Sequence, residues 1–168
     1  VLPGHDNMQI VTEVMRLLRK YKPDAVCVDF GMGTGVIDPL RTTHRIKVVE
    51  VKFGGSPAKK DSEWGNRGTE LWALVRDWLP GGMIDKSPEL LRDLTSREWV
   101  WSGREDTKKI LESKEVLALR GVPSPDDADA LACTFAVNLP RRDDKLHRGN
   151  GRVVIADGVG PNRFDRVQ

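Results

Sequence analysis

Residues 22–35 read KPDAVCVDFGMGTG, and this stretch says more about the fold than any other. Its first half is a short apolar run with Asp29 near its C-terminal end, which is typical of a buried strand in a parallel sheet. Gly31, Gly33 and Gly35 follow at once and predict a tight turn. Because open α/β sheets bind ligands beyond the C-terminal ends of their strands, Asp29 is the first candidate functional residue.

The segments on either side alternate between helical and extended patterns. Asp6 and Gln9 predict a capping box at the start of the first helix, and Ser124 is the expected cap of the last one. The expected helices are residues 8–21, 36–40 with Pro39 near its start, 66–79, 115–120 closed by Gly121, and 124–138, and the expected strands are 25–30, 46–53 and a hairpin within 97–111. This order predicts an α/β or α+β fold.

Composition excludes several classes of protein. The chain has 168 residues, enough for one domain, and its 27 basic and 25 acidic residues give a net charge of +2. This balance argues against a disordered polyampholyte and against a highly basic DNA-coating protein. No apolar run approaches the roughly 20 residues that span a bilayer. Cys27 and Cys133 lie in apolar runs and are expected to be buried thiols of a reducing compartment.

Charge is concentrated near the C-terminus. Residues 139–168 hold seven basic and four acidic residues, so residues 1–138 carry a net charge of −1. We expect residues 139–168 to form a basic, flexible tail with a mild preference for polyanions, or a solvated tail without a partner. The chain starts without Met or a signal-peptide pattern, and we expect it to be a piece of a longer protein.

A second candidate site lies in SPDDADAL, residues 124–131. Asp126 and Asp129 are three residues apart and share a helix face, whereas Asp127 points elsewhere. Acids in a first turn stabilise any helix, so the pattern alone is ambiguous. Asp129, however, lies among small and apolar residues, where an unpaired carboxylate would be costly to bury. A metal ion is the usual way to keep such a group charged.

Several segments follow one another in an order that resembles one protein family. After residues 22–38 come VKFGG at 51–55, NRGTELW at 66–72, LESK at 111–114, RG at 120–121 and SPDDADALACTFA at 124–136. Together they resemble the C-terminal nuclease domain of phage terminase large subunits over roughly residues 5–138.

The resemblance implies a ribonuclease H-like fold and an endonuclease that cuts concatemeric double-stranded viral DNA during packaging. Such an enzyme holds two Mg²⁺ or Mn²⁺ ions between carboxylates. Carried over to this chain, Asp29 and Asp129 are catalytic metal ligands and Asp126 assists as a metal ligand. Lys114 and Arg67 are candidate DNA-phosphate contacts, although either could form a local ion pair instead.

The resemblance also implies where such a chain works and with what. The expected partners are double-stranded DNA, the portal protein and the terminase small subunit, and the expected location is the bacterial host cytoplasm, at the procapsid.

One departure from the family affects the expected activity. The family's first catalytic Asp lies on an earlier strand, and neither Asp6 nor Asp24 fits that position. We therefore expect residues 1–138 to be the distal part of the nuclease domain, a partial ribonuclease H-like α/β fold lacking its first strands. Cleavage by this chain alone is expected to be weak or absent.

Two other functions fit parts of the sequence. Residues 28–35 are similar to the first motif of Rossmann-like methyltransferases that bind S-adenosylmethionine, with Glu50 placed to bind a ribose. A non-catalytic prophage remnant could instead dock on DNA or the portal through the basic tail. The five Trp residues are expected to pack in the core and hairpin, with base stacking as the less favoured alternative.

Overall fold

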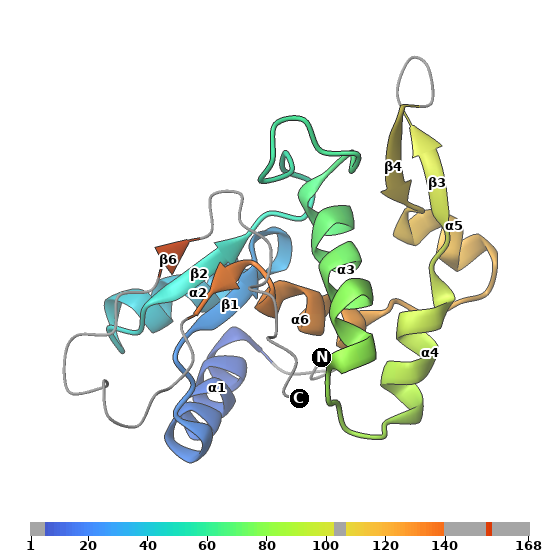
Figure 1. Cartoon of the computed structure of the whole chain (residues 1–168). Helices are drawn as coiled ribbons and strands as arrows, with labels where there is room; N and C mark the ends of the chain where they lie inside the picture. The colour runs from blue at the N-terminus through green and yellow to red at the C-terminus, as the bar shows by residue number, and fades with distance from the viewer. Residues whose placement is uncertain (1–5, 103–106, 140–153, 156–168) are drawn as a thin grey trace, which may run out of the picture.

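The computed structural model describes residues 6–102, 107–139 and 154–155 (Figure 1). Its elements are α1 (Asn7–Tyr21), β1 (Val26–Asp29), α2 (Phe30–Thr42), β2 (Val48–Val51), α3 (Arg67–Trp78), η1 (Leu79–Gly81), α4 (Pro88–Ser96), β3 (Trp99–Ser102), β4 (Lys108–Leu111), α5 (Lys114–Leu119), α6 (Asp126–Thr134), β5 (Val137–Asn138) and β6 (Val154–Ile155). None of the helices in these ranges is both long and apolar enough to cross a membrane.

Strands β1 and β2 form the parallel pair that the sequence predicts. Asp29 stands opposite Val51 at the C-terminal end of this pair. Helices α1 and α2 enclose a small core with the pair, to which Val11, Ile37 and Leu40 contribute side chains that are almost fully buried. The predicted capping box is confirmed, because Asp6 accepts the backbone N–H of Gln9 at 2.8 Å and donates its own N–H to the Gln9 side chain at 2.9 Å.

The predicted glycine-rich turn is wrong. Helix α2 begins directly after β1, with Asp29 as its N-cap, and residues 31–35 lie within the helix. Pro39, expected near a helix start, lies well inside α2. Each glycine costs about 1 kcal/mol in a helix interior, but the cap and the burial of apolar side chains further along α2 offset this cost. A Cβ at Gly35 would lie 2.1 Å from Asn7 Nδ2, so glycine permits the close approach of α1.

A larger core lies between β1–β2 and helices α3, α4 and α6. Helix α6 contacts β1, α3 and α4, and its small residues Ala128 and Ala132 pack against Leu71 and Val75 of α3. Gly68 brings the start of α3 close to the end of β2, since a Cβ there would lie 3.1 Å from the Phe53 side chain. This packing places α6 beside β1.

The predicted hairpin is confirmed as β3 and β4, which pair antiparallel. It stands apart from β1–β2, on the other side of α3 (Figure 1). The segment before α3 runs along β4, where Gly65 N–H donates to the Lys109 carbonyl at 2.8 Å and Lys109 N–H donates to the Glu63 carbonyl at 2.9 Å. Main-chain hydrogen bonds therefore hold the hairpin to the segment that leads into α3.

The last helix differs from its prediction at both ends. Helix α6 covers Asp126–Thr134 instead of residues 124–138, and Ser124 is not its cap, because the Ser124 hydroxyl donates to the Asp126 carboxylate at 2.7 Å. Residues 137–138 form β5 instead, which pairs with β6. Residues 154–155 of the predicted tail therefore pair with β5, and residues 140–153 and 156–168 lie outside the described residues.

A residue from another helix caps α6. Asp93 of α4, only 2% exposed, accepts the backbone N–H of Asp127 at 3.0 Å with one oxygen and pairs with Arg92 through the other. Helix α4 itself was not predicted, although Ser87 and Pro88 carry the usual signals for a helix start.

Replacing Asp93 should destabilise the fold. We expect Asp93→Ala to lower the free energy of unfolding by about 2 kcal/mol, because α6 loses its cap at a buried position. Urea titration followed by circular dichroism measures the change. Asp77→Ala, which removes a carboxylate that is 58% exposed, is the matched control and should cost less than about 0.5 kcal/mol. Equal effects of the two changes would contradict the capping role.

Candidate functional site

The Asp129 carboxylate is the most heavily contacted acid among the described candidates. Its side chain is 12% exposed, and the Trp72 indole N–H donates to Oδ1 at 2.9 Å. Arg97 Nη1 lies 3.5 Å from the same oxygen, and Lys114 Nζ lies 2.9 Å from Oδ2. Asp129 is therefore buried with protein partners, and the metal ion considered above is not needed to keep it charged. Protein cations and an indole balance the charge, so burial alone gives no argument for a metal.

Arg97 is the most buried cation of this site. Its guanidinium lies 5.2 Å from the centre of the Trp72 ring and donates to the Glu112 carbonyl at 2.6 Å. Burial lowers the pKa of Arg97, and the charges of Asp129 and Glu112 oppose this shift. Sequence reasoning missed Arg97, since nothing in its neighbourhood marks it apart from the hairpin that follows.

Lys114 lies between Asp126 and Asp129 of α6. Its Nζ is 3.9 Å from Asp126 Oδ1 and 2.9 Å from Asp129 Oδ2, which confirms that these acids share a face. Of the two roles considered for Lys114, the structure shows the local ion pair. The Lys114 side chain is 49% exposed, so the pair is partly screened by solvent.

A second buried carboxylate holds this corner of the molecule together. Glu112 is 4% exposed, pairs with Arg120 and accepts the backbone N–H of Glu98 at 2.9 Å. The hydrogen bond from Arg120 is the main cause of a lowered pKa of Glu112. These contacts tie the end of β4 to the start of β3 and so fix Arg97 and Lys114 on either side of Asp129.

Asp29 reaches the same region from the parallel strands. It is partly buried at the end of β1, accepts the Gly31 N–H at 3.2 Å, and belongs to a strand that contacts α6. The charges of both Asp29 and Asp129 affect the pKa of Cys133, which follows Asp129 by one turn of α6. Burial first, and then the negative charges of Asp29 and Asp129, raise the pKa of the Cys133 thiol to about 12. The two predicted acids are therefore both close enough to Cys133 for their charges to affect its thiol.

Arg67 is not brought to this site. It forms an ion pair with Glu70 in the first turn of α3, and both side chains are mostly buried. Glu70 also accepts the Ala58 N–H at 2.8 Å, so the pair fixes the loop before α3. The local ion pair considered in the sequence analysis is the role that the structure shows.

The features that suggested a methyltransferase have structural roles here. Residues 31–35 are helical and form no loop that could surround a nucleotide. Glu50, the candidate ribose ligand, pairs with Arg41 of α2.

Comparison with known proteins shows a likeness in fold. No family model matches the chain, and no curated protein matches it. A solved structure that does match is a mutant nuclease domain of the large terminase subunit gp2 of bacterial virus Sf6, with manganese and beta-thujaplicinol. The TM-score is 0.57 at 20% identity, and the match covers 75% of this chain and 70% of that one. The fold of this chain is therefore similar to that of a terminase nuclease domain.

Replacing Arg97 should destabilise the fold. We expect Arg97→Ala to lower the free energy of unfolding by about 3 kcal/mol, because a mostly buried carboxylate loses its buried cation. Denaturant titration tests this. Arg16→Ala is the control, since Arg16 is 59% exposed in its pair with Glu13 and its loss should cost no more than about 0.5 kcal/mol. If Arg97→Ala lowers the free energy of unfolding no more than Arg16→Ala does, the contact between Arg97 and Asp129 adds nothing to stability.

Cys133 should make the fold sensitive to alkali. Its pKa is about 12 in the folded chain, above the ordinary thiol value, so the unfolded chain loses this proton first. The contribution of the protonated thiol to the free energy of unfolding is therefore fully present below about pH 9, and it is lost as the pH rises from about 9 to 12. Unfolding titrations at pH 8.5 and 10.5 should show a larger loss for the wild type than for Cys133→Ala. Parallel losses would refute the assignment.

Proposed function

We propose that this chain contributes to a terminase-type nuclease domain that hydrolyses phosphodiester bonds of double-stranded DNA. The observation that carries the proposal is that strand β1, which ends at Asp29, contacts helix α6, which holds Asp129. The similarity in fold to the Sf6 nuclease domain supports it. In this proposal Asp29 and Asp129 are the principal acids, Asp126 assists, and the substrate, the portal protein and the terminase small subunit are its partners at a bacterial procapsid.

The side chains as they lie do not fit a complete two-metal centre. Within the described ranges, no group of three or more His, Cys, Asp or Glu side chains could hold a metal ion. The Asp129 carboxylate is already neutralised by Lys114 and Arg97. The manganese of the Sf6 structure belongs to that protein.

We therefore propose that the acids of this chain act only when a further acidic ligand joins them from a segment outside the described residues. The chain's own contribution is to hold Asp129 in place through Trp72 and Arg97, while Asp29 is held at the end of β1. On this basis the chain alone should bind Mg²⁺ or Mn²⁺ weakly and cleave little DNA.

Plasmid cleavage in the presence of Mn²⁺ tests both parts of this proposal. We expect little cleavage by the 168-residue chain and clear cleavage by the same chain extended upstream in its reading frame. In the extended chain, Asp29→Asn and Asp129→Asn should each lower the rate at least about a hundredfold, as expected for loss of a residue on which the chemistry depends. Asp61→Asn, which changes an exposed loop acid, is the matched control.

The outcomes of this experiment distinguish the nuclease function from the need for a further acidic ligand. Comparable cleavage by the short chain, abolished in Asp129→Asn, would show that the site is complete and would overturn only the need for a further ligand. A folded extended chain that binds DNA without cutting it would overturn the nuclease function. That result would favour the second candidate, a non-catalytic DNA-docking module, which the existing neutralisation of Asp129 by protein cations also fits.

A further inference from the structure

Three tryptophans gather on one face of the hairpin and the segment beside it. Trp99 and Trp101 lie two residues apart on β3, and Trp64 is bridged to Lys109 on the neighbouring β4. The Trp64 and Trp99 rings lie 5.2 Å apart, and Trp101 is 60% exposed. We call Trp64, Trp99, Trp101, Arg76 and Lys109 the tryptophan cluster.

Two cations lie against these rings. Arg76 of α3 is 5.5 Å from the centre of the Trp64 ring and 5.7 Å from that of Trp99. Lys109 is 5.7 Å from Trp64 and 5.3 Å from Trp101. Their acidic partners, Asp77 for Arg76 and Glu63 for Lys109, are each 58% exposed. Exposed pairs of this kind are weak, so a phosphate group can replace either carboxylate at little cost.

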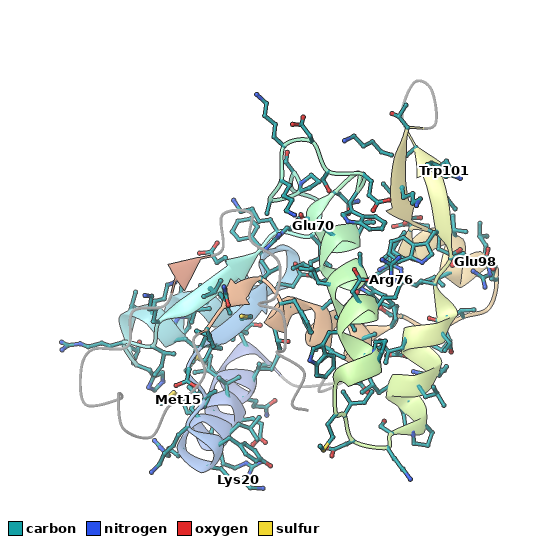
Figure 2. All side chains as sticks on the ribbon, in the orientation of Figure 1. Met15, Lys20, Glu70, Arg76, Glu98 and Trp101 are labelled. Carbon is teal, nitrogen blue, oxygen red and sulfur yellow. The ribbon has the colours of Figure 1, made fainter. Side chains whose placement is uncertain are left out.

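The cluster is joined to the Asp129 site at two points. Trp72, which donates to Asp129, precedes Arg76 by one turn of α3, a rise of about 6 Å. Arg97, which also contacts Asp129, precedes Trp99 by two residues at the start of the hairpin. Figure 2 shows Arg76 pointing from α3 toward the hairpin, and Trp101 on the hairpin itself. A polymer lying across the acids would meet the cluster next.

We propose that the tryptophan cluster binds a single-stranded segment of nucleic acid by stacking bases on its exposed indole rings. This proposal rests on the proposed function, which identifies the strand as DNA. It adds that the DNA held beside the acids is single-stranded. Aromatic rings interleaved with cations are the chemistry that recognises unpaired bases, because every base has a flat face and every linkage carries a phosphate. Duplex DNA offers no free base face along its length, so an unwound or cleaved end is the form that fits.

Binding of a fluorescent oligothymidylate to the 168-residue chain tests the proposal without any cleavage. The measurement is fluorescence anisotropy in EDTA, with a duplex of equal length as the competitor. We expect the single strand to bind more tightly than the duplex, and Trp101→Ala to weaken its binding about tenfold. Trp101→Phe should restore most of the affinity, and Lys109→Ala should lower the slope of log K against log salt by about one.

Tyr21→Ala is the matched control. Tyr21 is 62% exposed with Lys20 4.7 Å from its ring, so it has the same chemistry on α1, and Figure 2 shows Lys20 far from Trp101. Unchanged affinity in Tyr21→Ala beside a loss in Trp101→Ala supports the proposal. Equal losses, a preference for duplex, or no binding of the oligothymidylate overturns it. Since EDTA removes metals, failure of nuclease activity is a separate result that leaves this one intact.

Discussion

The architecture around the candidate site depends on the charge of one mostly buried carboxylate. Asp129 is contacted by Trp72 of α3, by Arg97 at the start of the hairpin and by Lys114 at the start of α5. A carboxylate in such a place is tolerated only where donors and cations compensate for lost water. Because these partners come from different elements, the requirement to neutralise a single side chain fixes how those elements sit around α6.

Local patterns predicted the elements whose causes are local. The α1 capping box lies within four residues, and the β3–β4 hairpin follows from a weak alternation around Trp99, Trp101, Ile110 and Leu111, which lie close in sequence. The failures have longer-range causes. The cap of α6 is Asp93, which lies 34 residues before Asp127, whose N–H it accepts. The prediction that Ser124 caps this helix is therefore wrong. The glycines after β1 were expected to form a turn. They lie in α2 instead, because the buried side chains that follow them pack against α1, and a short stretch of sequence does not show such contacts.

The same distinction applies to the candidate site. Asp29, Asp126 and Asp129 could be named from the sequence because strand ends, helix faces and a family resemblance mark them. Lys114 could be named too, with a local ion pair as one of its two roles. Trp72 and Arg97 could not, since Trp72 lies 57 residues from Asp129 and Arg97 lies 32 residues from it. One signal was available for Trp72, because a buried indole N–H needs an acceptor and a carboxylate is the strongest one.

The contacts that hold Asp129 also fix the position of the tryptophan cluster. Arg97 is clamped between Asp129 and the Glu112 carbonyl, and the strand that follows it begins with Trp99. On the other side, α3 presents Trp72 to the carboxylate and Arg76 to the rings along one helix face. Moving the hairpin away from α3 would therefore pull Arg97 from Asp129 and leave a mostly buried charge without its buried cation. The spacing between the acids and the cluster is accordingly set by buried electrostatics, whereas the Trp101 ring stays largely open to solvent.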